Sequence, residues 1–98
     1  MFINVEYPVL GGWGEWQDAD AEIQEICNDI RNAVEEEMGR DGFSKFTAVS
    51  YMSQVVSGTN YKIKLDVGEE YYLEISVYQH WSNELTLNTA EFGKVTLS

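Results

Sequence analysis

The sequence predicts an α+β fold in which one long helix packs across a four- to five-stranded antiparallel sheet. Between residues 18 and 38, apolar residues recur in steps of three and four, which is typical of an amphipathic helix. From Phe46 onward the period changes to two, which is typical of half-buried strands. Because the helix precedes an antiparallel meander, its apolar stripe is buried most simply across one face of the sheet.

The length of 98 residues predicts a single domain over residues 1–98, since such a chain supports one modest core. Residues 1–12 form a short apolar arm that ends in Gly11-Gly12, and we expect this arm to be flexible. The apolar fraction of 44% and the aromatic fraction of 13% are ordinary for a folded globular protein.

The charge of the chain excludes two classes of partner. With 17 acidic and 6 basic residues, the formal net charge is -11. Such a surface repels phosphate backbones and anionic lipids, so we expect neither a nucleic acid nor a membrane as partner. The acidic run at residues 35–37 is interpreted as a solvated helix face, because no second cluster of ligands accompanies it. No metal and no cofactor are therefore expected.

Cysteine use and the amino terminus predict a cytoplasmic protein. Cys27 is the only cysteine, so no internal disulfide can form, which suits a reducing compartment. The first ten residues lack the basic segment of a secretory signal, and no apolar run approaches the length of a membrane span.

The helix has recognisable ends. Asp18 or Asp20 can cap its start, because a carboxylate accepts hydrogen bonds from the unpaired amides of the first turn. Gly39 and the Asp41-Gly42 pair are stop signals. The residues of the apolar stripe are Ile23, Ile26, Cys27, Ile30, Val34 and Met38. Cys27 is thus interpreted as a small buried hydrophobe.

Four stretches after the helix are predicted to be strands. They are residues 46–54, 61–67 and 73–77, followed by a last strand that contains Leu85 and Leu87, with Val95 left open. Turns are expected at residues 55–58, 68–70 and 80–83.

Alternate turns of a meander fall at the same edge of the sheet, so the first and third of these turns are neighbours. This edge carries Val55, Val56 and Trp81, whereas the opposite edge carries two glutamates. Apolar side chains gathered at one edge are typical of a binding surface.

Several of these segments together carry a family resemblance. QVVSG at 54–58, with TNYKIKL after it, resembles the first hairpin loop and next strand of the cystatins, inhibitors of papain-like cysteine proteases. EIQEI at 22–26 is similar to the helix start of the stefins, the intracellular branch without disulfides. VLGG at 9–12 resembles the glycine-bearing arm, and His80-Trp81 lies where the second hairpin loop belongs.

The resemblance implies a reversible, tight-binding inhibitor of papain-like, cathepsin-type cysteine proteases, and not an enzyme. Three apolar segments would fill the active-site cleft of the protease as a wedge. The residues implied are Val9, Leu10, Gly11 and Gly12 of the arm, Gln54, Val55, Val56, Ser57 and Gly58 of the first loop, and His80 and Trp81 of the second. We expect a monomer, with an exchange of strands between two copies left open.

The second loop departs from the family, since it has neither the Leu-Pro of stefins nor the Pro-Trp of secreted cystatins. Two other functions therefore stay open. One is a cystatin-fold interaction module, or an engineered binding scaffold, with a non-protease partner. The other is an enzyme in which His80 and a carboxylate act as an acid/base pair.

Individual residues also have structural alternatives. The two valines could be strand core, Gly11-Gly12 could be a plain linker, and Trp81 could fold back onto the core. His80 is interpreted as a turn residue. Trp13 and Trp16 either pack on the protein or contact the partner, and the sequence favours neither.

Overall fold

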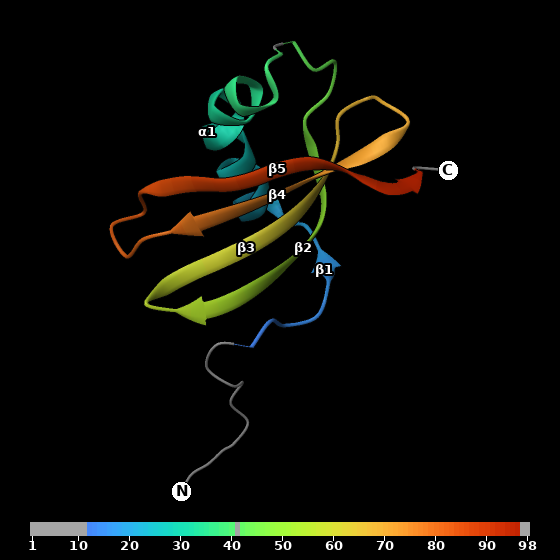
Figure 1. Cartoon of the computed structure of the whole chain (residues 1–98). Coiled ribbons are helices and arrows are strands. Elements are labelled where there is room, and N and C mark those ends of the chain that lie inside the picture. The colour runs from blue at the N-terminus through green and yellow to red at the C-terminus, as the bar shows by residue number, and fades with distance from the viewer. Residues whose placement is uncertain (1–11, 41, 97–98) are drawn as a thin grey trace, which may run out of the picture.

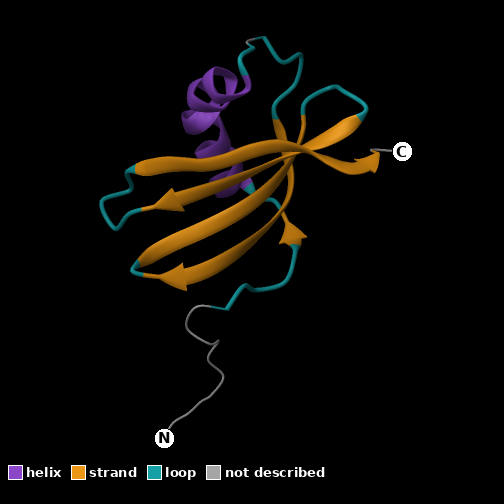
Figure 2. Ribbon diagram, in the orientation of Figure 1, coloured by secondary structure: helices purple, strands orange, loops and turns teal. Residues whose placement is uncertain are grey.

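The computed structural model describes residues 12–40 and 42–96 (Figures 1 and 2). Their elements are β1 (Gln17–Asp18), α1 (Ala21–Met38), β2 (Thr47–Val56), β3 (Gly58–Asp66), β4 (Tyr71–Gln79) and β5 (Leu85–Thr96). The strands form one antiparallel sheet in the order β1-β2-β3-β4-β5, and α1 lies across one face of it (Figure 1). The predicted α+β fold is confirmed. In the described part of the chain, no helix is long and apolar enough to cross a membrane.

The ends of α1 follow from local chemistry. Asp20 is the cap, and its Oδ1 accepts a hydrogen bond from the amide of Ile23 at 3.0 Å. Asp18 cannot serve, because it belongs to β1 and pairs with Ser50 of β2. At the other end Gly39 takes a left-handed conformation, with φ 69°, and ends the helix as expected.

The core lies between α1 and the sheet. All residues of the predicted helix stripe are buried except Met38, which is half-buried. The sheet contributes the alternate side chains of β3 and β4 that face the helix, and they are fully buried: Ile63, Leu65, Leu73, Ile75 and Val77. Cross-strand pairs such as Ile63 and Ile75 bring these side chains together.

The first hairpin differs from the prediction, since β2 continues through Val56 and does not end at Gln54. Val56 pairs with Gly58, so Ser57 alone connects β2 to β3. Val55 and Val56 are therefore strand residues at the tip and not members of a wider turn. A reversal this tight needs the backbone of Gly58, whose φ is 115°.

The two outer strands of the sheet, β1 and β5, show features that the apolar periodicity of the sequence did not predict. β1 has only two residues, both polar and exposed, so no alternation predicted it. The last strand, β5, continues through Val95, the residue that the sequence left open.

Candidate functional site

Two hairpin tips lie at the same edge of the sheet. In Figure 1 the β2–β3 and β4–β5 connections are both at the left, whereas the β3–β4 connection is at the right. Thr59 of β3 lies opposite Gln79 of β4, which places the two tips beside each other. We call residues 54–58 and 80–83 the tip edge.

The tip edge carries two of the most exposed large apolar side chains of the described residues. Val55 is 58% exposed and Trp81 is 72% exposed. Val56, the next residue along the strand, is half-buried. The alternative that Trp81 folds back onto the core is wrong. The alternative for the two valines holds in part, because both belong to β2 and the turn is displaced to Ser57, but Val55 is not a core residue. Exposed apolar side chains gathered at one edge are typical of an interaction surface.

Gly58 is held in a space that admits no side chain. A Cβ added there would lie 2.5 Å from the hydroxyl oxygen of Tyr78 and 2.6 Å from the carbonyl oxygen of Gln79. The hydroxyl of Tyr78 donates a hydrogen bond to the carbonyl of Ser57. The β4 strand therefore supports the first tip directly.

Sequence reasoning did not single out Tyr78. The sequence does indicate that its side chain lies near the site. Tyr78 alternates with the buried residues of its strand and precedes the second tip by two residues. The hydrogen bond to Ser57 depends on the register of β3 against β4, which the pattern alone does not give.

The polar residues of the first tip brace it. The side-chain oxygen of Gln54 accepts a hydrogen bond from the side-chain amide of Asn60 at 2.8 Å. These two residues face each other across β2 and β3. Ser57 is exposed at the very end of the hairpin.

The second tip is a turn organised by His80. Its amide donates to the carbonyl of Glu84 at 2.9 Å, and its own carbonyl accepts from the amide of Asn83 at 2.8 Å. Its Nδ1 accepts from the amide of Ser82 at 3.2 Å. Asn83 takes a positive φ of 73°, which asparagine tolerates well. These bonds hold Trp81 on a defined turn without a proline.

The segment before β1 also reaches the first tip. Trp13 forms an isolated antiparallel bridge with Gln54, and the amide of Gly14 donates to the carbonyl of Ser53 at 2.9 Å. Gly12, the last residue of the predicted arm, is exposed next to this bridge. The predicted site residues Val9, Leu10 and Gly11 lie outside the described residues.

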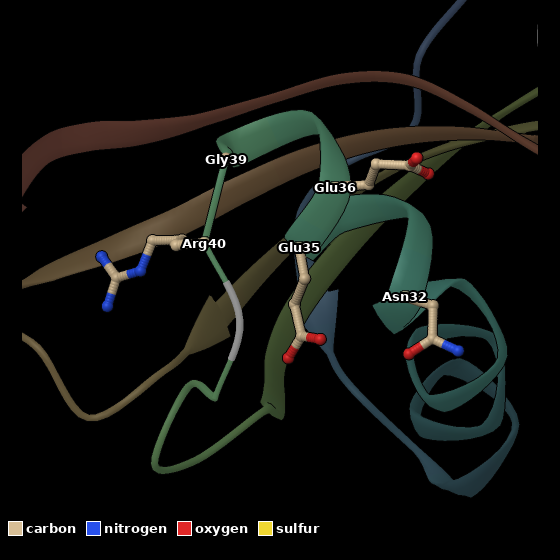
Figure 3. A pocket seen from close by; sticks show the side chains of 5 residues that line it. All are labelled: Asn32, Glu35, Glu36, Gly39 and Arg40. Atoms are coloured by element: carbon tan, nitrogen blue, oxygen red, sulfur yellow. The ribbon is translucent and has the colours of Figure 1, made fainter.

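A hollow at the end of α1 offers no competing site. It is lined by Asn32, Glu35, Glu36, Gly39 and Arg40. Figure 3 shows the side chains of Glu35, Glu36 and Arg40 pointing in different directions, with no common centre. Arg40 forms an ion pair with Glu69 of the β3–β4 connection, so the hollow lies at the end of the molecule opposite the tip edge.

Cys27 and His80 do not form reactive centres. Cys27 is fully buried, and burial raises the pKa of its thiol to about 12, which keeps it in the neutral, weakly nucleophilic form. The imidazole of His80 lies beside Ser82 and the ring of Tyr78. Among the described residues, no group of histidine, cysteine and acidic side chains could hold a metal ion.

Comparison with known proteins agrees with this geometry. Residues 11–95 match the family described as "Cystatin domain". The chain is 38% identical over 91 residues to Stefin-C of Bos taurus, which covers 90% of this chain and 89% of that protein. It is 42% identical over 81 residues to Cystatin-B of Homo sapiens, covering 80% and 82% of the two chains.

A third relative is the Leukocyte cysteine proteinase inhibitor 1 of Sus scrofa, which is 45% identical over 74 residues, or 76% of this chain and 71% of that protein. The match to the Cystatin domain spans the helix, the sheet and both hairpin tips. The chain therefore belongs to the cystatin family, as a stefin-like member, and this is a family of cysteine protease inhibitors and not of enzymes.

Proposed function

We propose that the protein is a reversible, tight-binding inhibitor of papain-like, cathepsin-type cysteine proteases. It plugs the active-site cleft with a three-part apolar wedge. The parts are the arm (residues 9–12), the first hairpin tip (residues 54–58) and the second tip (His80 and Trp81). The observation that carries this proposal is that two exposed apolar side chains, Val55 and Trp81, share one edge of an acidic protein.

The bracing of the first tip supports tight binding. Tyr78 holds the carbonyl of Ser57, and Asn60 holds the side chain of Gln54. A tip that is already ordered loses little conformational entropy when it docks. On docking, the side chains of Val55 and Val56 are transferred from water to the apolar walls of the cleft, which favours binding.

Trp81 supplies the large, stiff contact that often dominates a protein interface. Its exposure of 72% leaves most of the indole free to be buried by a partner. The backbone hydrogen bonds of His80 to Glu84 and Asn83 hold the backbone of the turn that carries Trp81.

The arm would act as a peptide mimic. Val9 and Leu10 occupy substrate pockets, while Gly11 and Gly12 lack the side chains that would force the chain toward the catalytic thiolate. The backbone turns away before it presents a cleavable bond. This assignment rests on the resemblance of VLGG to the arm of the family.

We further propose that the inhibitor acts in the cytoplasm as a monomer. Its single cysteine is buried as a free thiol, which suits a reducing compartment. A monomer leaves the tip edge open to the protease.

Titration of papain tests the function. Residual protease activity should fall in proportion to added protein and reach near zero at a ratio of one to one. Papain whose thiol has been blocked is the control, and it should still bind, because the wedge makes no covalent bond. Full activity at an excess of the protein would contradict the proposal and favour an interaction module with another partner.

Replacement of Trp81 tests the second tip. We expect Trp81→Ala to weaken binding by about 1–3 kcal/mol, as truncation of an interface aromatic commonly does. Tyr71→Ala is the matched control, because Tyr71 is also an exposed aromatic but begins β4 at the far end of the sheet. Inhibition constants that change equally in both variants, or in neither, would remove Trp81 from the wedge.

A further inference from the structure

Two tryptophans that precede the helix lie outside the proposed wedge, and each is held by a lysine of β3. The ammonium of Lys62 lies 4.9 Å from the centre of the Trp13 ring. The ammonium of Lys64 lies 4.3 Å from the centre of the Trp16 ring. The two tryptophans are 37% and 38% exposed, so more than half of each is covered. Of the two alternatives left by the sequence, the packing role fits these contacts.

The lysines project from the face of the sheet that is opposite the helix. They alternate along β3 with Ile63 and Leu65, which are fully buried beneath α1. The indoles therefore lie on the outer face and reach across β2 to its neighbour β3.

These pairs are two of the four contacts between a cation and an aromatic ring in the described part of the chain. The other two cations, Arg31 and Arg40, lie over phenylalanine rings and also form ion pairs with carboxylates. Lys62 and Lys64 lie over the two indoles. A cation above the face of an indole is attracted by the ring electrons, and the interaction persists at a partly exposed surface.

Followed from β1 back toward the amino terminus, the backbone of the same segment runs along the edge of β2 that faces away from β3. It approaches the tip edge, as the blue trace of Figure 1 shows. Gln17 and Asp18 pair with Tyr51 and Ser50. Farther along, the amide of Gly14 bonds to the carbonyl of Ser53, and Trp13 forms a bridge with Gln54. Followed toward the amino terminus, Trp13 is thus the last residue of the described chain that pairs with β2.

We propose that Trp13, clamped by Lys62, is a positioning residue for the inhibitory arm. We call the contact between the ammonium of Lys62 and the ring of Trp13 the clamp. It fixes the pairing of Trp13 with Gln54, immediately beside the first hairpin tip. The proposal rests on the proposed function, because it assumes that the arm enters the protease cleft together with that tip.

The physical basis is effective concentration. Once the two hairpin tips are docked, binding of the arm is an intramolecular step whose strength depends on where the arm is tethered. With the clamp intact, the arm is tethered to the sheet at Trp13, which forms a bridge with Gln54. Without the clamp, the chain can detach from β2 back to β1, which lengthens the tether and lowers the local concentration of the arm at the cleft.

Trp16 provides the matched comparison. It has the same contact with a lysine, but it lies next to β1, which the ladder to β2 holds in place. Loss of its ring contact should leave the start of the tether unchanged. Lys64→Met likewise matches Lys62→Met in its loss of charge.

The test is the rate of dissociation from papain, measured for Trp13→Ala and Lys62→Met in the full chain and in a chain that lacks residues 1–10. In the full chain each variant should dissociate about three to ten times faster. In the shortened chain the same substitutions should have no effect, because Val9 and Leu10, the side chains that the arm would place in the cleft, are gone. Trp16→Ala and Lys64→Met should change the rate less than about twofold in either chain.

Three results would overturn the proposal. An effect of Trp13→Ala that persists in the shortened chain would mean that the indole contacts the protease itself or supports the fold. An unchanged rate in the full chain would mean that the clamp does not serve the arm. Equal effects of the Trp16 and Trp13 variants would mean that Trp13 has no role in positioning the arm that Trp16 lacks.

Hydrogen exchange of the free protein separates this inference from the proposed function. The amide of Gly14 should exchange faster in Trp13→Ala and Lys62→Met, because its bond to Ser53 loses support. Unchanged exchange would overturn the clamp whatever happens with papain. Faster exchange in a protein that leaves papain fully active would overturn the proposed function and leave the clamp standing.

Discussion

At the scale of single residues, the first hairpin tip depends on Gly58. Its backbone has a φ of 115°, a region that residues with a side chain rarely adopt. The hydroxyl and the ring of Tyr78 and the carbonyl of Gln79 also occupy the place where a Cβ would lie. Because Tyr78 also bonds to Ser57, any movement that makes room for a side chain would loosen the tip as well.

We therefore expect Gly58→Ala to lower the free energy of unfolding by about 1–3 kcal/mol, through backbone strain and crowding. Urea denaturation measures the change. Gly93→Ala is the control, because a Cβ added at Gly93 in β5 would lie at an ordinary contact distance of 3.7 Å from the carbonyl oxygen of Tyr72. Equal losses of stability in the two variants would show that the tip is not specially constrained.

At the scale of elements, α1 shows how a neighbouring strand selects among local signals. Asp18 and Asp20 both have the chemistry of a helix cap, and both precede the apolar stripe. β1 takes Asp18 into the sheet, and the amide of Ala19 bonds to the carbonyl of Val49. The helix can begin only after this attachment, which leaves Asp20 at the cap.

Asp20→Ala should destabilise the protein by about 1 kcal/mol, because the amide of Ile23 loses its acceptor. Asp18→Ala should change the free energy of unfolding by less than about 0.5 kcal/mol, since its side chain is exposed on an edge strand. Thermal and urea unfolding of the two variants measure the difference. A larger loss for Asp18→Ala would contradict the assignment of the cap.

At the scale of the whole molecule, apolar contact and charge meet beside the second hairpin tip. The tip edge presents Val55 and Trp81, while the chain as a whole carries a net charge of -11. Three exposed carboxylates of α1, those of Glu22, Glu25 and Asp29, line a hollow that also includes Asn83 of the tip edge. A protease of positive charge would be attracted over a distance, and apolar contacts would then hold it.

Because charge acts over a distance and apolar contact acts only after docking, the two rates of binding should differ in their dependence on salt. Association with a positively charged protease should slow several-fold between about 20 and 300 mM salt, as screening shortens the range of attraction. Dissociation should change little, because apolar contacts dominate the docked wedge. Stopped-flow and displacement measurements give the two rates. An association rate that does not respond to salt would exclude steering by charge.

Much of the fold could be predicted from local patterns. The step of three and four residues located the buried stripe of α1, and the alternation around Ile63 and Ile75 located two central strands. The parity of the turns placed both hairpin tips at one edge, where the structure has them. The functional role of the tip residues and of the arm stays a prediction, supported by the family to which the chain belongs.

The sequence by itself determined the helix, the meander and the edge where Val55 and Trp81 lie, because these follow from periodicity and from the direction of successive strands. Tertiary structure decided which aspartate caps the helix and which residues support the first tip. It also decided that Trp13 lies under Lys62. Several of those contacts, such as the bond from Tyr78 to Ser57, join residues that are far apart along the chain. Their geometry depends on the register between strands, which a pattern of apolar and polar residues does not specify.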